Sequence, residues 1–404
     1  MWEEWRKGVY ILTAVQFVMR VSITSIRPFV PLYLPEIGVS LPQQIAFWTG
    51  IATSANFFAQ ILTQPIWGSV ADRYGYKTMV VRSVFAVGFF NVALIWASSV
   101  NQFVLVRFFM GLMSGFTAAS ITFVAVTSPG DKLGYSVGLL QAGQMAGTIL
   151  GPGVGGVFAE LFGYKGTFLF SGLIGLAMVP LIIFGIKYNP VKEMPENSLR
   201  FSPETRKAGI KALPAALAGI DKLIIVMLVI IACTQFGTQS SDSFIAIFIR
   251  EIYSGDRINL VVALSYALAA SAALLAAPLF GTVGDRYGHR HILHISLIGM
   301  AAAVGLQTFC ANVQQLIILR VLSGIFAAGI LPSAYAIIGS LAGEGRKGRI
   351  FGIAGSATAI GNLSGPLFGG IIASVFSLRT VFWTTAVVII AVEIFSQAYR
   401  NRIS

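Results

Sequence analysis

Charged residues are scarce in this sequence. Asp, Glu, Lys and Arg together make up 11% of the 404 residues, whereas a soluble chain of this size would carry roughly 25%. Apolar residues make up 56%, and the mean hydropathy is +0.79. Because a helix needs about 20 apolar residues to cross a bilayer, this length holds twelve such helices joined by short loops. The composition predicts an all-α membrane protein with twelve transmembrane helices.

Cysteine and histidine are also rare, with two and three residues. Cys233 and Cys310 belong to different apolar runs without metal-type spacing, so we interpret them as small core residues. The three histidines cluster near residue 290 but lack the spacing of metal ligands. No P-loop, other nucleotide motif or nucleophile–base pair occurs. We therefore expect no cofactor, no metal, no direct use of ATP and no enzymatic activity.

The chain has few acidic residues, and its net charge is +12. Nucleic-acid binding would be one explanation, but the positions of the basic residues argue against it. Most of the 28 lysines and arginines lie in the loops on one side of the predicted spans, and only Lys165, Arg250, Arg257 and Arg379 lie in loops on the other side. This bias follows the positive-inside rule. It predicts that both termini are cytoplasmic, and we expect a location in the bacterial inner membrane.

Two halves of the chain repeat each other. The segment PIWGSVADRYGYK at 65–77 recurs as PLFGTVGDRYGHR at 278–290, which is 213 residues further along. Arg107-Phe-Phe-Met-Gly and Arg320-Val-Leu-Ser-Gly have the same displacement, and the glycine-rich segments 147–156 and 361–370 differ by 214. A repeat of this length indicates duplication. We predict a six-helix bundle at 1–186, a cytoplasmic linker at 187–221 with an amphipathic helix near 204–217, and a second bundle at 222–404.

The predicted spans lie between the turn and charge signals. They are 8–35, 44–70, 77–98, 102–125, 134–159, 165–186, 222–249, 258–283, 291–310, 313–341, 350–375 and 379–399.

These motifs resemble those of the major facilitator superfamily, and within it the twelve-span drug:proton antiporters. The segment 68–77 is similar to the superfamily's motif between spans 2 and 3, except that Tyr76 stands where relatives usually carry a basic residue. Arg107 and Gly111 match the span 4 motif, and residues 147–156 resemble the span 5 antiporter motif. The resemblance implies proton-coupled export of a small organic solute by a carrier that opens to one side of the membrane at a time.

The same resemblance suggests a conformational gate at the cytoplasmic ends of spans 2 and 8. Asp72 with Arg73 and Lys77 would clamp the two halves and release them when the carrier turns inward, while Gly68 would allow close backbone contact. The second copy supplies the equivalent residues, namely Gly281, Asp285, Arg286 and Arg290. The alternative is a plain surface turn with topogenic charges.

Spans 5 and 11 carry rows of small residues that permit close helix contact in lipid, with one proline in each row that removes a helical hydrogen bond. We predict hinges formed by Gly151, Pro152, Gly155, Gly156, Gly365 and Pro366. Static tight packing is the alternative for these residues.

Polar side chains within spans are costly in lipid, so they indicate function. Span 1 carries Gln16, Arg20, Thr24 and Arg27 on one helical face, and span 7 carries Gln235, Gln239 and Asp242. The repeat places Arg27 and Asp242 at nearly the same depth. We predict that these two pair or exchange partners, and that protonation of Asp242 couples proton movement to opening. The alternative is a permanent structural ion pair.

The resemblance implies that Arg107 in span 4 takes part in a proton relay. The alternative is that this arginine binds backbone carbonyls. The further candidates for substrate contact are Asn56, Gln60, Gln141, Gln144, Tyr266 and Asn362. The alternative for each is an interhelical hydrogen bond, worth about 0.6 kcal/mol. Glu160 and Glu393 lie near predicted span ends, where we expect them to reach lipid headgroups.

The sequence thus favours an exporter driven by protons, with a small organic substrate, protons and membrane lipid as its partners and a monomer as its working form. Because span 1 holds two arginines and no acid, we expect a substrate with an anionic or polar part, such as a siderophore or metabolite, although multidrug transport also fits. The alternatives are a proton-coupled importer of an anionic nutrient and a membrane sensor or scaffold without transport.

Overall fold

The computed structural model describes residues 2–129, 132–186, 222–342 and 347–400, and in these ranges it contains helices and no strands. The elements are α1 (Trp2–Ile26), η1 (Arg27–Phe29), α2 (Val30–Tyr33), η2 (Leu34–Ile37), α3 (Pro42–Tyr74), α4 (Tyr76–Ala93), η3 (Leu94–Trp96), α5 (Val100–Met113), α6 (Phe116–Thr127), α7 (Leu133–Gly185), α10 (Lys222–Ile252), α11 (Ile258–Tyr287), α12 (His289–Gln307), α13 (Val313–Leu341), α14 (Lys347–Val375) and α15 (Leu378–Arg400). The predicted linker 187–221, with its amphipathic helix, lies outside the described residues.

Twelve membrane crossings account for these helices, as the composition predicted. Within the described residues, ten helical stretches are long and apolar enough to cross a membrane. One of them, α7, has 53 residues and reverses at Gly163, whose φ of 70° favours glycine, so its two arms are separate crossings. The ten stretches therefore hold eleven crossings. The twelfth crossing is α12, which packs against α13 and α15.

The fourth crossing differs from the uninterrupted span that we predicted. It is divided into α5 and α6 at Ser114 and Gly115, and Gly115 has a φ of 126°. Neighbouring side chains satisfy the polar groups freed by this break. The Trp67 indole N–H donates to the carbonyl of Leu112 at 2.6 Å, and Arg82 Nη2 donates to the carbonyl of Ser114 at 3.4 Å. The Gln60 amide also holds the Ser114 side chain, by donating to its hydroxyl at 2.7 Å. A break inside a membrane helix is tolerated only where such partners exist.

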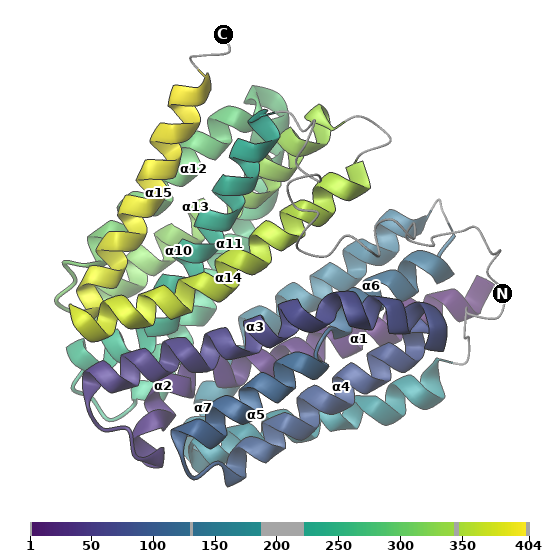
Figure 1. Cartoon of the computed structure of the whole chain (residues 1–404), viewed down its shortest axis with the longest axis horizontal. Helices are drawn as coiled ribbons and strands as arrows, with labels where there is room; N and C mark the ends of the chain where they lie inside the picture. The colour runs from purple at the N-terminus through teal and green to yellow at the C-terminus, as the bar shows by residue number, and fades with distance from the viewer. Residues whose placement is uncertain (1, 130–131, 187–221, 343–346, 401–404) are drawn as a thin grey trace.

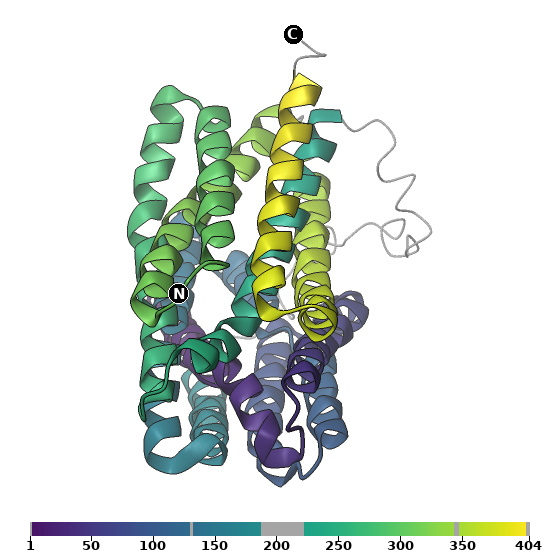
Figure 2. The ribbon, with the colours of Figure 1, turned by 90° about the vertical axis from the view of Figure 1, so that its left-hand side faces the viewer.

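The helices form two bundles that meet at one end and diverge toward the other (Figure 1). Where they meet, α3 packs on α14 and α7 packs on α11; the first of these contacts is visible in Figure 2. The Ser54 hydroxyl donates to the Leu363 carbonyl at 2.8 Å, and the Tyr164 hydroxyl donates to Asn259 Oδ1 at 3.1 Å. The sequence assigns this end of the molecule to the outside. The structure is therefore closed between the bundles at this end and open at the opposite end (Figure 1).

Glycines make the closest helix contacts within each bundle. A Cβ atom added at Gly147 would lie 2.4 Å from the Phe17 carbonyl oxygen of α1, and one added at Gly361 would lie 2.4 Å from the Ala232 carbonyl oxygen of α10. The predicted hinge glycines behave alike: added Cβ atoms would approach α1 at Gly151 and Gly155, α11 at Gly156 and α10 at Gly365 to within 2.5 Å. Close packing of the small-residue faces is confirmed, while the hinge at Pro152 and Pro366 stays a prediction.

In the first copy of the predicted gate, the one side chain described, Lys77, makes its contacts within its own bundle. Lys77 Nζ donates to the carbonyls of Ile183 and Ile186 at the end of α7, in its own bundle. A cation is stabilised there because a helix C-terminus carries partial negative charge. The side chains of Asp72 and Arg73, and Gly68 beside them, lie outside the described residues.

The second copy of the gate motif likewise makes its contacts within its own bundle. Asp285 pairs with His289 one turn later at 3.1 Å, and Arg286 lies over the Tyr287 ring at 5.4 Å. Arg290 lines a small cavity beside His294. The expected close backbone approach at Gly281 is wrong for this conformation, because an added Cβ atom would meet nothing within 4 Å. Because the bundles diverge at this end (Figure 1), the contacts that the second copy makes among the described residues all stay within the second bundle.

Two acidic side chains differ from the expected headgroup contacts. Glu393 is 3% exposed and lies in the core, where its Oε1 is 2.7 Å from His294 Nδ1 and accepts a bond from Gln397. The prediction failed because α15 packs against α12 and turns this face of the helix inward. Glu160 is exposed, but its carboxylate accepts a hydrogen bond from Asn259 of the other bundle at 3.1 Å.

Candidate functional site

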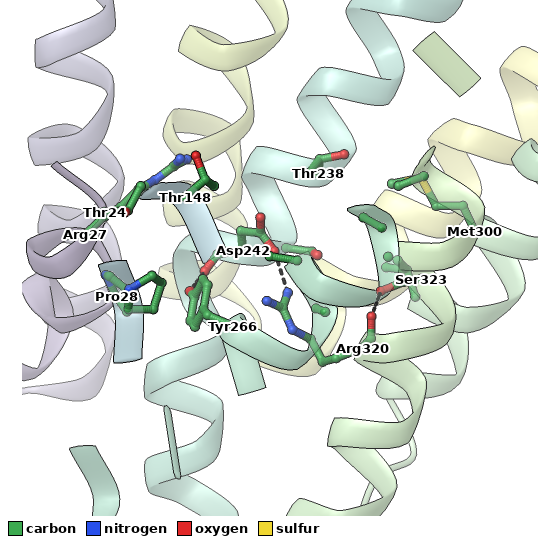
Figure 3. A pocket seen from close by; sticks show the side chains of 18 residues that line it. Thr24, Arg27, Pro28, Thr148, Thr238, Asp242, Tyr266, Met300, Arg320 and Ser323 are labelled. Carbon is green, nitrogen blue, oxygen red and sulfur yellow. Dashed lines mark hydrogen bonds and ion pairs between the residues drawn. The ribbon is translucent and has the colours of Figure 1, made fainter. Parts of the chain in front are cut away.

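A cavity of about 220 Å³ lies between the two bundles (Figure 3). Charged and hydroxyl side chains occupy part of its wall, and small residues of α11 and α13 form much of the remainder. The lining residues are Thr24, Arg27, Pro28, Thr148, Pro152, Thr238, Ser241, Asp242, Tyr266, Ala269, Ala270, Ala273, Met300, Val304, Arg320, Ser323, Gly324 and Ala327. Because both halves contribute, a solute held here would contact the two bodies that a carrier moves.

An ion pair stands on the wall formed by the second bundle. Arg320 of α13 donates from Nη1 to Asp242 Oδ1 of α10. The Arg320 guanidinium also lies over the Tyr266 ring at 4.7 Å, and the Tyr266 hydroxyl donates to the backbone carbonyl of Asp242. The two partners differ in accessibility, since the Asp242 side chain is 28% exposed and that of Arg320 is 6% exposed. The cavity thus presents the carboxylate and shields the guanidinium.

The wall formed by the first bundle carries a cation, Arg27. Its Nη2 donates to Gln239 Oε1 at 2.5 Å, and its guanidinium lies 6.0 Å from the centre of the Phe57 ring. The predicted pair between Arg27 and Asp242 is therefore wrong for this conformation. The repeat placed both residues at one depth, but Arg320 reaches Asp242 from within the same bundle. Arg27 instead meets Gln239, one helical turn before Asp242.

Three arginines of the first bundle lie near one another. The charge of Arg27 acts on both Arg20 and Arg107, and none of the three makes an ion pair with an acid in the described part of the chain. Arg20 lies 3.5 Å from the Thr117 hydroxyl. Arg107 is 7% exposed, and its Nε has no hydrogen-bond partner among the described residues. Several cations without acids make this side of the cavity electropositive.

Four of the predicted substrate and proton-coupling residues line the cavity, namely Thr24, Arg27, Asp242 and Tyr266, and so does the predicted hinge residue Pro152. Several others contact neighbouring helices instead, as their alternative interpretation allowed. The Asn56 amide donates to the Arg107 carbonyl at 3.1 Å, and the Gln235 amide donates to Asn362 Oδ1 at 3.3 Å.

The outcome for the other predicted glutamines varies. Gln60 also bonds to a neighbouring helix, because its amide donates to the Ser114 hydroxyl. Gln239 accepts a hydrogen bond from Arg27 of the other bundle. Gln16 is 1% exposed without a hydrogen-bond partner among the described residues. Gln141 is exposed and Gln144 half-buried on α7, and neither lines this cavity.

Sequence reasoning missed Arg320 as a site residue. The signal was present, because the repeat pairs Arg320 with Arg107, which we had selected as a charge inside a span. The two are 5% and 7% exposed, so both halves bury an arginine at this point of the repeat. Only the second half also provides an acid, Asp242. The alanine wall of α11 carries no comparable signal in the sequence.

Comparison with known proteins gives consistent results along the whole chain. The model of the Major Facilitator Superfamily matches residues 12–247 and again residues 227–402. The multidrug resistance protein MdtG of Yersinia enterocolitica is 29% identical over 396 residues, covering 97% of this chain and 92% of MdtG. The uncharacterized MFS-type transporter YuxJ of Bacillus subtilis is 29% identical over 377 residues, covering 92% of each chain.

Solved structures share the fold at lower sequence identity. A bacterial homologue of the human lysosomal transporter Spinster, in an inward-facing and unoccupied conformation, superposes with a TM-score of 0.79 at 16% identity. The match covers 98% of this chain and 96% of the homologue.

Proposed function

The chain belongs to the major facilitator superfamily, and from that premise we propose that it exports a small organic solute by alternating access, driven by protons that enter the cell. The observation that carries this proposal is the cavity between the bundles, which holds a carboxylate accessible to solute and protons. The bundles meet at one end and diverge at the other, which is the geometry that a carrier open to one side requires.

Asp242 is the residue that we propose for proton coupling. Protonation removes its negative charge and with it the ion pair with Arg320. Since Gln239 lies one helical turn away and bonds to Arg27 of the other bundle, a change at Asp242 lies next to a contact between the moving bodies. One proton that crosses 100 mV releases about 2.3 kcal/mol, which is available to drive the solute outward.

The direction of transport rests on the relatives. MdtG is named a multidrug resistance protein, and we infer that this chain likewise removes solutes from the cell, as a monomer in the bacterial inner membrane with both termini in the cytoplasm. The cations around Arg27 support a solute with an anionic or polar part, such as a siderophore or metabolite, and the apolar alanine wall allows for amphipathic drugs.

A second candidate function is proton-coupled import of an anionic nutrient. The observation that favours it is Arg27, which lines the cavity and bonds to a neutral glutamine. Uptake and efflux in oriented vesicles, measured with and without a pH gradient, separate the two directions.

The test of the export proposal uses purified protein in liposomes and a solute first identified in a binding screen of charged and neutral compounds. We expect an imposed proton gradient to drive accumulation against the solute gradient, and Asp242→Asn to abolish this while counterflow exchange persists. Unimpaired driven transport by Asp242→Asn would remove this residue from the coupling. A protein that neither moves solute nor couples it to protons would instead be a sensor or scaffold.

A further inference from the structure

The cavity presents two opposite charges to a solute, one from each bundle. Asp242 is the accessible member of its ion pair, and only its Oδ1 is bonded to Arg320; Oδ2 has no comparable contact among the described residues. Arg27 lines the cavity opposite, and its partners among the described residues are the neutral Gln239 and the Phe57 ring. Figure 3 shows Arg27 on one side and the Asp242–Arg320 pair on the other.

Arg320 is a poor binding residue for an anion despite its charge. Its side chain is 6% exposed, its Nη1 is held by Asp242, and its guanidinium is covered on one side by the Tyr266 ring at 4.7 Å. An anionic group that entered the cavity would meet the Asp242 carboxylate first and be repelled by it. The accessible anion site is therefore Arg27.

The direction of coupling then depends on which group of the solute approaches Asp242. An anionic group near this carboxylate favours its protonation, so solute and proton bind together and move in the same direction. A cationic group competes with the proton for the carboxylate, so that binding of one releases the other. Only the second arrangement lets inward protons drive a solute outward.

Resting on the export function proposed above, we propose that the substrates of this carrier are small zwitterions, whose cationic group binds Asp242 and whose anionic group binds Arg27. Such a solute spans the cavity and contacts both bundles. It also accounts for a site in which Arg27 faces a carboxylate that can exchange protons. The cavity of about 220 Å³ lies below the roughly 300–1,000 Å³ of drug-sized sites, which favours metabolites of about the size of an amino acid among the solutes considered above.

The experiment compares three probes with a common scaffold: phenylalanine, its methyl ester, which carries only the positive charge, and N-acetylphenylalanine, which carries only the negative charge. Binding to the purified full-length protein is measured by calorimetry, and proton movement is measured with a pH dye in liposomes. The variant is Arg27→Gln, with Arg27→Lys as the charge-retaining version. Arg257→Gln, an exposed arginine in a loop outside the cavity, is the matched control.

We expect the zwitterion to bind about tenfold or more tightly than its ester, because one charge-assisted contact is worth at least that factor. Arg27→Gln should reduce zwitterion binding to the level of the ester, while Arg27→Lys and Arg257→Gln should retain the difference. Outward movement of zwitterion and ester should each release protons inward.

Two results would overturn the zwitterion proposal: equal binding of zwitterion and ester by the unaltered protein, or inward proton movement driven by the N-acetyl anion. If another solute shows proton-driven efflux, either result leaves the export function standing. If no solute shows it, the export function itself fails.

Discussion

The ion pair between Asp242 and Arg320 makes a quantitative prediction that depends on the unequal burial of its members. At an effective dielectric constant of about 20, two unit charges 4 Å apart attract by roughly 4 kcal/mol. Asp242→Asn removes this attraction and leaves a charged side chain, that of Arg320, which is 6% exposed, so the free energy of unfolding should fall by about 3–5 kcal/mol. Arg320→Gln leaves a carboxylate that is 28% exposed and partly hydrated, so its loss should be smaller, about 1–3 kcal/mol.

Thermal unfolding in detergent, followed by tryptophan fluorescence, measures both effects. At 2–4 °C per kcal/mol for a bundle of this size, Asp242→Asn should lower the Tm by roughly 6 °C or more. The double variant should be more stable than the sum of the single losses by about 2 kcal/mol, because it leaves no unpaired charge. Strictly additive losses, or a larger loss for Arg320→Gln than for Asp242→Asn, would refute the ion pair and its burial order.

Two further predictions concern packing. Gly155→Ala places a Cβ atom 2.1 Å from the Ser25 carbonyl oxygen and should destabilise by about 1–3 kcal/mol. At Gly153, inside the same helix, nothing lies within 4 Å of an added Cβ atom, so Gly153→Ala should keep or slightly raise the Tm. Equal Tm values for the two variants would contradict the close helix contact. Glu393→Ala deprives the His294 imidazole of its buried acceptor and should lower the Tm by several degrees. Glu393→Gln keeps an oxygen acceptor, so its Tm should fall less. If Glu393→Ala had the same Tm as the unaltered protein, the bond between Glu393 and His294 would contribute nothing to stability.

The crossings were predictable from sequence because their signals are local and repeated. A run of about 20 apolar residues specifies a transmembrane helix by itself, and the duplicated motifs fixed the division into two bundles. The break at Gly115 was not predictable in this way. It depends on Trp67 and Arg82 from two other helices, whose side chains donate to the Leu112 and Ser114 carbonyls that a continuous helix would bond internally.

The site was only partly predictable, because depth and face do not determine which helices are neighbours. Spacing correctly placed Thr24, Arg27 and Asp242 on cavity-facing positions. It could not decide whether Asp242 would pair across the cavity or within its bundle, since Arg320 approaches from α13. Glu393 shows the same limit, because its position near a span end is compatible with either headgroups or the core until the packing of α12 on α15 is known.

In the mechanism that we propose, the division of charge between the bundles lets one cavity respond to both solute and proton. The first bundle places Arg27 at the cavity, near Arg20 and Arg107, without an acid in the described part of the chain, so its field attracts an anionic group. The second bundle places its carboxylate at the cavity and shields the partner arginine. A solute that bridges the two walls replaces the single bond between Arg27 and Gln239 as the polar link across the cavity. Protonation weakens only the carboxylate side, so we expect the solute to leave from the second bundle first.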